Sequence, residues 1–361
     1  MTDISLISIS VTIIFVIAGF IKKNSVLLFI SQASWMWILL AGNTNSIDYE
    51  VNSKIYALAE ANSGMPYQSI MYWFARQNYD FFSFNAVIAT FVLLFFYILI
   101  YKKSRNPCFV LSLIFIFPFI DFVIQKRFFI ASILGILFLY FFTTKGNLPR
   151  KIFAILLFIL AVSIHEGIGL FAIFFLYPMF AQSNHKRLFF TILFLSALVF
   201  TSVLPQFAAM LPFVGEERAE LYFVTLHEKI KYPFLTTSVF TLMHLFFVWL
   251  YYRLYRYSSM NGTNYPTGET VLYLNLISLL ILPIYYWEPT FFRMFRTLLP
   301  LNYIAISNMM PVGQIYKKKL FFQGIRYVAF SSIIFLGYYF VLSAGFDVVA
   351  QPIFEDNILF E

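Results

Sequence analysis

Charged residues are scarce in this sequence of 361 residues: Asp, Glu, Lys and Arg make up 12% of it, and hydrophobic residues 61%. A soluble domain carries roughly 25% charged residues, because it must cover its surface with groups that water solvates. This composition excludes a soluble globular domain. The mean hydropathy of +0.79 instead indicates that lipid surrounds much of the chain.

Other absences narrow the chemistry. The single cysteine, Cys108, permits neither an intrachain disulfide nor a thiolate metal site. No histidine pair has metal-ligand spacing, the acidic residues are scattered, and neither a Walker A loop nor a GxGxxG motif is present. The net charge of +8 comes from short basic clusters between apolar runs, without the basic stripe typical of nucleic-acid binding. We therefore expect no metal, no cofactor and no nucleic-acid partner.

Long apolar runs dominate what is present. Many approach the ~20 residues that cross a ~30 Å hydrocarbon core as a helix. A transmembrane β-barrel is excluded because its strands alternate polar and apolar residues, whereas 86–101 is apolar on every face. The sequence predicts an all-α polytopic membrane protein, with 1–361 forming one integral membrane domain. About twelve spans are expected, at 4–21, 26–42, 84–101, 107–124, 128–143, 152–164, 167–182, 188–204, 234–252, 270–287, 297–311 and 325–345.

Basic residues set the expected orientation. The first apolar run ends at Lys22 and Lys23, whereas a signal peptide would carry its charge first. Placing these lysines in the cytoplasm puts most later basic clusters there as well, as the positive-inside rule requires. The long segments 43–83 and 205–233 then become external loops, and loops of that length usually carry function.

The region 152–182 is the hardest to assign to spans that alternate between the two sides of the membrane. As one helix it would be roughly 47 Å long, too long for one span and too short for two. Basic residues flank both ends, which favours a short hairpin broken at His165-Glu166-Gly167. A single span would give eleven passes instead.

Two pairs of cations lie near external membrane ends, where the positive-inside rule disfavours them. Lys126 and Arg127 open an inward-going helix, whose positive dipole end and free N–H groups favour an anion such as phosphate. Arg127 is the better phosphate ligand because its planar group binds two oxygens at once. The alternative is a salt bridge from this pair to Asp121.

Arg293 and Arg296 are one helical turn apart and can reach the same ligand. Two separate external pairs suggest two phosphate sites. The alternative is that Glu288 neutralises Arg293, while Arg296 extends to lipid head groups.

His165 lies in the expected break beside an acid. It could act as a general base, hydrogen-bond a substrate or simply pack. Glu166 and Asp48 are the competing bases, and His244 is set aside because it stands alone in an apolar helix.

The external loops are rich in Tyr and Trp, which suits stacking on sugar rings but also suits an interfacial aromatic belt. Tyr49, Tyr56 and Gln125 are the expected sugar-binding residues.

Four features occur in a characteristic order: Asp48-Tyr49 followed by Tyr56, the helix start from Arg127 to Ala131, His165, and Phe291-Phe292-Arg293. In this order the chain resembles the EpsG-like group of the Wzy family, the O-antigen and capsular polysaccharide polymerases. The resemblance implies a GT-C-like polymerase architecture in the plasma (inner) membrane, with external loops over a cavity that faces the periplasm or the extracellular side.

The resemblance also implies a reaction. Such polymerases transfer a growing glycan from undecaprenyl diphosphate to the next lipid-linked repeat unit, and a chain-length regulator is the expected partner. Arg127 with Lys126 would stabilise the leaving diphosphate, and Arg293 with Arg296 would hold the second one. His165, Glu166 or Asp48 would deprotonate the acceptor. An O-antigen ligase, another lipid-carrier glycosyltransferase and a polysaccharide transporter or flippase remain the alternatives.

Overall fold

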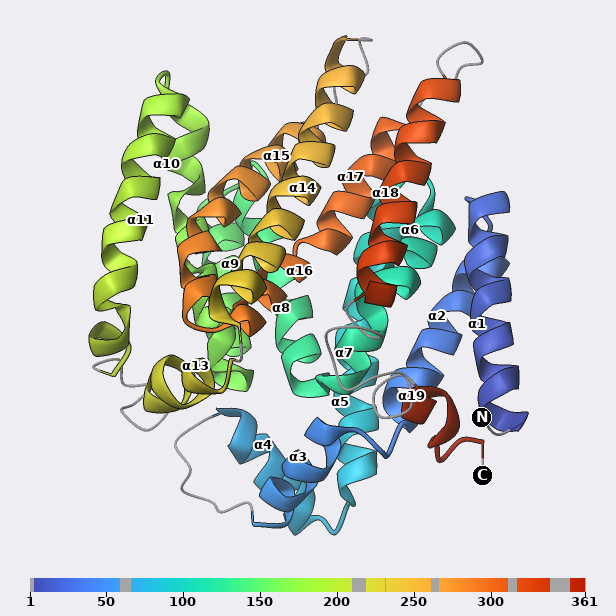
Figure 1. Ribbon diagram of the computed structural model, residues 1–361. Helices are drawn as coiled ribbons and strands as arrows, with labels where there is room; N and C mark the ends of the chain where they lie inside the picture. Colours follow the sequence, from blue (N-terminus) through green and yellow to red (C-terminus); the bar gives the residue numbers. More distant parts are fainter. Residues whose placement is uncertain are drawn as a thin grey trace.

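The computed structural model describes residues 3–58, 66–209, 219–230, 232–260, 266–310, 317–337 and 351–360. Every regular element in this part of the chain is a helix, which confirms the all-α prediction (Figure 1). In chain order the helices are α1 (Asp3–Ile21), α2 (Val26–Gly42), α3 (Ile47–Ala57), α4 (Pro66–Arg76), α5 (Phe81–Lys103), α6 (Pro107–Ile114), η1 (Phe115–Phe119), α7 (Ile120–Ile124), α8 (Lys126–Thr143), α9 (Leu148–Ile164), η2 (Glu166–Leu176), α10 (Tyr177–Gln182), α11 (Lys186–Ala209), η3 (Leu221–Thr225), α13 (Leu226–Lys229), α14 (Pro233–Met260), α15 (Pro266–Ser278), η4 (Leu279–Tyr286), η5 (Pro289–Phe291), α16 (Phe292–Arg296), α17 (Leu299–Met309), α18 (Lys317–Gly337) and α19 (Gln351–Glu355).

Seven helical stretches among the described residues are long and apolar enough to cross a membrane. They are Asp3–Ile21, Phe81–Lys103, Pro107–Ile124, Lys126–Thr143, Lys186–Gln206, Pro233–Met260 and Thr267–Tyr286. Shorter helices occupy the other predicted segments, and the last of those segments continues beyond residue 337 into a part that is not described. The chain is therefore a polytopic membrane protein.

The helices divide into a buried centre and a lipid-facing rim. In the stretch Pro107–Ile124, 89% of the most apolar window is buried, and in Lys126–Thr143 the value is 72%. The corresponding values are 17% for α1 and 6% for α11, which lie at opposite edges of the molecule (Figure 1). A helix that is apolar on all sides belongs inside a bundle or against lipid. The stretches Pro107–Ile124 and Lys126–Thr143 lie inside the bundle, and α1 and α11 face lipid.

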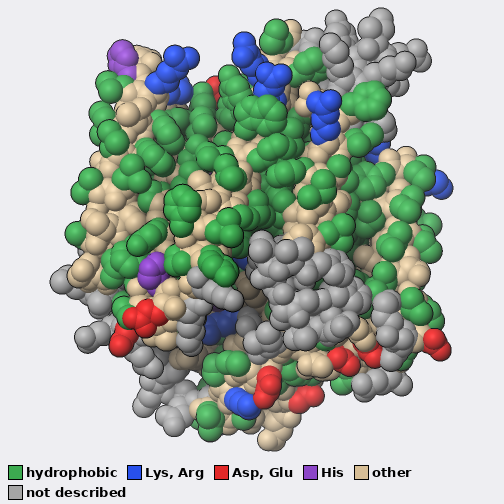
Figure 2. All heavy atoms as spheres, in the orientation of Figure 1, with side chains coloured by type: hydrophobic (Ala, Val, Ile, Leu, Met, Phe, Trp, Pro, Cys, Tyr) green, Lys and Arg blue, Asp and Glu red, His purple; other side chains and the backbone are tan. Residues whose placement is uncertain are grey.

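The two ends of the bundle differ in charge. The short helices α3, α4, α13 and α19 gather at one end, where Figure 2 shows most of the acidic side chains. Basic side chains crowd the opposite end in the same view. We call these the acidic end and the basic end. Such a separation is what the positive-inside rule produces in a membrane protein.

The expected break in 152–182 is confirmed. Helix α9 ends at Ile164 because His165 adopts an extended conformation, with φ −147° and ψ 111°. The 3-10 helix η2 begins at Glu166 and continues into α10, so α9 and η2–α10 form a hairpin. A second break occurs at Gln125, with φ −106° and ψ 56°, between α7 and α8. Because α8 packs against both α9 and η2, its start lies near the His165 break.

Candidate functional site

Helix α8 begins with both predicted cations, Lys126 and Arg127. The preceding residue, Gln125, does not cap the helix with its side chain. Its half-buried side chain also keeps a buried Oε1 atom without a hydrogen-bond partner among the described residues. The positive end of α8 therefore lacks the side-chain acceptor that usually satisfies a helix start.

Arg127 is held by three contacts. Its Nε donates a hydrogen bond of 2.5 Å to the backbone oxygen of Ile164, the last residue of α9. Its terminal nitrogen lies 3.8 Å from a carboxylate oxygen of Glu166, and its guanidinium carbon lies 5.8 Å from the ring centre of Tyr67. The Arg127 side chain is still 20% exposed. The group is thus oriented by protein and remains within reach of a ligand.

Tyr67 was not among the predicted site residues. It lies in α4, is 5% exposed and places its ring against Arg127. Burial raises the pKa of Tyr67 to about 12, although the nearby Arg127 charge acts in the opposite direction. The phenol is therefore neutral at physiological pH. The one sequence feature that could have suggested Tyr67 is its position in an external loop rich in aromatic residues.

His165 uses one ring nitrogen to start the next helix. Its Nδ1 accepts a hydrogen bond of 3.1 Å from the backbone N–H of Gly167. In a neutral imidazole one nitrogen accepts and the other carries the proton. The proton therefore belongs on Nε2, which makes His165 a hydrogen-bond donor in this arrangement.

Arg293 approaches the same place from α16. Its guanidinium carbon lies 5.3 Å from the ring centre of Phe128, and the residue is only 8% exposed. Among the described residues, its Nε has no hydrogen-bond partner and no carboxylate forms an ion pair with it. No ion pair of the described chain joins Glu288 to Arg293, the predicted alternative; a Glu288 carboxylate oxygen accepts from the backbone N–H of Thr290 instead.

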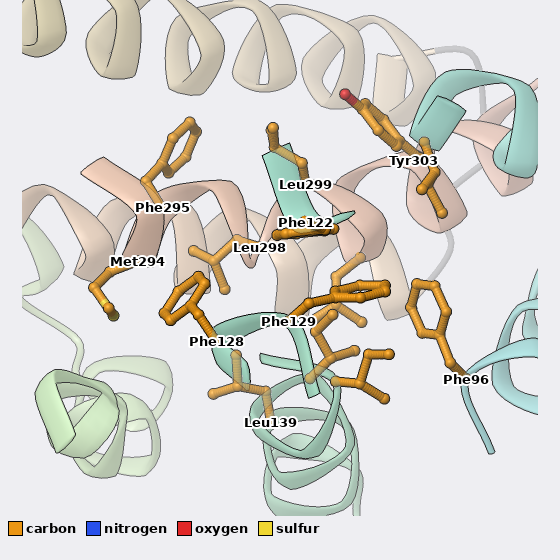
Figure 3. Packing of buried hydrophobic residues seen from close by; sticks show 14 of the residues in the cluster. Phe96, Phe122, Phe128, Phe129, Leu139, Met294, Phe295, Leu298, Leu299 and Tyr303 are labelled. Atoms are coloured by element: carbon orange, nitrogen blue, oxygen red, sulfur yellow. The ribbon is translucent and has the colours of Figure 1, made fainter. Parts of the chain in front are cut away.

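The ring of Phe128 brings these groups together. It meets the His165 ring edge-on at 5.2 Å between centres, and it also lies against Arg293. Figure 3 shows Phe128 in the core, where side chains from α7, α8, α16 and α17 pack. The beginning of α8, the His165 break and α16 therefore converge. We call Arg127, His165, Glu166 and Arg293 the Arg127 site.

Lys126 makes its contacts elsewhere, although it is next to Arg127 in the sequence. Its Nζ donates to the backbone oxygen of Asn43, directly after α2, and lies 4.9 Å from the ring centre of Tyr49. A cation at a helix C-terminus is stabilised by the helix dipole. Asn43 is fixed in turn by its side-chain hydrogen bond of 3.0 Å to the backbone oxygen of Pro352.

Arg296 pairs with Asp121 of α7, and the exposed fractions of the two side chains are 5% and 4%. Two predicted alternatives are therefore wrong: the salt bridge from Lys126 and Arg127 to Asp121, and the extension of Arg296 to lipid head groups. Asp121 pairs with Arg296, while the cations at the start of α8 donate to the backbone oxygens of Asn43 and Ile164. Arg296 is buried in the bundle and does not extend to lipid head groups.

The predicted sugar-binding tyrosines are largely occupied by protein. Tyr56 is 6% exposed, donates a hydrogen bond of 2.8 Å to the backbone oxygen of Tyr79, and packs on Phe81. Tyr49 carries Lys126 over its ring. Asp48 belongs to α3, but its side chain lies outside what the structure describes.

His244 is a satisfied core histidine. Its two ring nitrogens lie 2.9 Å from the hydroxyl of Tyr285 and 2.9 Å from the hydroxyl of Ser278. Its ring also stacks on Phe295 at 3.8 Å between centres. These contacts identify His244 as a packing residue of the bundle.

These features define a polytopic helical membrane protein with a polar, partly exposed cluster at the acidic end of its helices. The chain belongs to the EpsG family, whose family model matches residues 26–354. No curated protein and no solved structure matches the chain. Membership of this family indicates a function of the polysaccharide-polymerase type.

Proposed function

We propose that this protein polymerises oligosaccharide repeat units carried on undecaprenyl diphosphate, at the outer leaflet of the plasma membrane. Family membership supports the reaction class. The observation that carries the proposal is Arg293, a nearly buried cation without an acidic partner in the described chain, which lies over the Phe128 ring that also meets His165. A buried cation without a partner is costly, and an anionic ligand removes that cost.

The diphosphate of the donor binds between Arg127 and Arg293. The sugar C1–O bond to the diphosphate breaks, its electron pair stays on the diphosphate oxygen, and a new C1–O bond forms to the acceptor hydroxyl. Guanidinium groups fixed beforehand stabilise the charge that develops on the leaving group. The energy of the glycosyl diphosphate bond drives the step, which agrees with the lack of nucleotide motifs.

Glu166 is the proposed general base. Its carboxylate pairs with Arg127 at 3.8 Å in the ligand-free arrangement, and a diphosphate competes for the same guanidinium. Donor binding thus releases the carboxylate to accept the proton of the acceptor hydroxyl. His165 is less suited to this role, because Gly167 already occupies its Nδ1 lone pair. We assign it a hydrogen bond to the substrate through Nε2.

Lys126 and Arg296 support the site instead of binding a second diphosphate. Their charges already face the end of α2 and Asp121, respectively. The proposal therefore contains one diphosphate site, where the sequence suggested two. A chain-length regulator remains the proposed partner.

Replacement of Arg127 tests the function. In the native host, Arg127→Ala is expected to leave the protein in the membrane at its usual amount while the glycan ladder shrinks to single repeat units. Arg127→Lys is also expected to fail, because an ammonium group cannot bind two phosphate oxygens in one plane.

The matched control is Arg150→Ala, which removes an exposed arginine that donates to the backbone oxygen of Lys145, away from the Arg127 site. It should leave the ladder unchanged. Full ladders in Arg127→Ala cells would refute the role of the arginine. Long chains that accumulate on the undecaprenyl carrier without reaching their final acceptor would indicate a ligase.

A further inference from the structure

An apolar groove of about 720 Å³ runs between α2 and α5, away from the Arg127 site. Residues of both helices form its walls. They include Val26, Ser34 and Trp37 of α2, and Thr90, Tyr97 and Lys102 of α5. The groove is thus lined almost entirely by apolar and aromatic side chains, and Lys102 is its only charged residue.

Hydrogen bonds fix the spacing of the two walls. The Tyr97 hydroxyl donates to the backbone oxygen of Ala33 at 3.0 Å. Trp37 Nε1 donates to the Thr90 hydroxyl at 2.8 Å, near the end of the groove that is farther from Lys102. Because both bonds cross from one helix to the other, the groove is a built feature of the fold and not a loose gap between helices.

The length of the groove matches one lipid leaflet. From Val26 to Trp37, α2 rises by roughly 17 Å at 1.5 Å per residue. Half of a ~30 Å hydrocarbon core is about 15 Å. A single acyl chain entering from the basic end would therefore follow the groove to its far end.

A polar pocket of about 570 Å³ opens at the Lys102 end of the groove and shares Tyr101 and Lys102 with it. Its other lining residues are Asn24, Lys103, Ser104, Arg105, Pro107 and Asn308. The pocket contains three basic residues and no acidic one. Arg105 is anchored through a hydrogen bond of 3.2 Å to the backbone oxygen of Met310. A cationic pocket thus continues directly into an apolar groove.

We propose that these two parts form a binding site for one anionic phospholipid. Its phosphate lies in the pocket against Lys102 and Arg105, and one acyl chain fills the groove between α2 and α5. Charge complementarity selects an anionic head group, and the cytoplasmic leaflet, which the basic end is expected to face, is the one that carries such lipids. The site is independent of the reaction proposed for the Arg127 site.

Trp37 provides the probe, since it lines the far part of the groove. The purified full-length protein is placed in neutral lipid with increasing fractions of phosphatidylglycerol or phosphatidylcholine that carry the same brominated acyl chains. Bromine quenches tryptophan fluorescence at contact. Subtracting the quenching of the Trp37→Phe variant isolates the contribution from the groove.

Phosphatidylglycerol is expected to quench Trp37 at a several-fold lower fraction than phosphatidylcholine does. Lys102→Gln/Arg105→Gln should reduce this preference by about fivefold or more, since a membrane-surface basic residue contributes about fivefold in affinity for anionic lipid. The matched control, Lys145→Gln/Arg150→Gln, removes two exposed basic residues of the same end that do not line the pocket. It should leave the preference intact.

Ser34→Phe provides a second, steric test, because residue 34 lines the groove and is exposed. A filled groove should lose quenching by both lipids. Equal quenching by the two lipids in the unaltered protein, or an unchanged preference in Lys102→Gln/Arg105→Gln, would overturn the proposal and leave only non-selective boundary lipid.

Discussion

Lys126 and Arg127 are neighbours in the sequence, and Arg293 and Arg296 are one helical turn apart, yet the fold treats the two members of each pair differently. One member is engaged by protein elsewhere: Lys126 donates to a backbone oxygen at the end of α2, and Arg296 pairs with Asp121. The other member, Arg127 or Arg293, belongs to the Arg127 site. Proximity in sequence therefore does not make two cations ligands of the same anion.

The difference follows from the cost of buried charge. Arg296 has an exposed side-chain fraction of 5% and requires its carboxylate, because an isolated ion in the membrane interior is expensive. Arg127 shares Glu166 at 3.8 Å and retains partial exposure, while Arg293 has no acid among the described residues. Excess positive charge therefore remains at the Arg127 site, where an anion would bind.

The largest expected effect comes from breaking the ion pair between Asp121 and Arg296. Asp121→Asn removes the carboxylate that pairs with buried Arg296, and we expect it to lower the free energy of unfolding by about 3–5 kcal/mol. Unfolding of the purified protein in mixed micelles, followed by tryptophan fluorescence during SDS titration, measures this loss.

The double variant Asp121→Leu/Arg296→Met separates the structural role of the ion pair from a role of Arg296 in substrate binding. Replacing both ions by apolar residues of similar size should restore most of the stability, and polymer should still form. A stable double variant that makes no polymer would show that Arg296 binds substrate. Arg293 and Arg296 would then share the same role.

A smaller effect is expected within the Arg127 site. Glu166→Gln keeps the size of the side chain but removes the base, and should slow polymerisation by about 10²-fold or more. His165→Asn should cost less, because an asparagine oxygen can still accept the Gly167 N–H and its amide can still donate. Initial rates of glycan extension in purified membranes, normalised to protein amount, compare the two. The reverse ranking would make His165 the base.

The smallest effect is expected at Tyr67. Tyr67→Ala removes the ring beside Arg127 and should weaken transition-state binding by about 0.5–2 kcal/mol, whereas Tyr67→Phe keeps the ring and should be nearly neutral. Because burial raises the pKa of Tyr67 to about 12, its phenol stays protonated over the range in which the assay runs. The Phe variant should therefore show the same pH–rate profile as the unaltered protein. A profile that loses an alkaline limb in Tyr67→Phe would show that the phenol titrates during the reaction.

Much of the fold could be predicted from the sequence, because lipid imposes a simple rule on it. Apolar runs of spanning length predicted a helix at each segment, and the misfit of 152–182 correctly located the break at His165. The division into seven longer and several shorter helices could not be predicted, since pairing between helices decides how much of each run stays regular.

The site was predictable only in part. Unfavourable charge at the membrane ends pointed to Arg127 and Arg293, and the broken helix to His165 and Glu166. Which anion meets which cation depends on contacts between distant segments, such as Asp121 with Arg296, and no local pattern encodes them. Tyr67 was missed for the same reason, because only the packing of α4 brings it to Arg127.

Binding of undecaprenyl diphosphate to the purified protein in nanodiscs tests the central claim most directly, with the monophosphate as the reference ligand. We predict that Arg127→Ala and Arg293→Ala each abolish the preference for the diphosphate, while Asp121→Leu/Arg296→Met retains it. Unchanged diphosphate affinity in both alanine variants would contradict the account, because the excess positive charge of the Arg127 site would then have no role in holding the substrate.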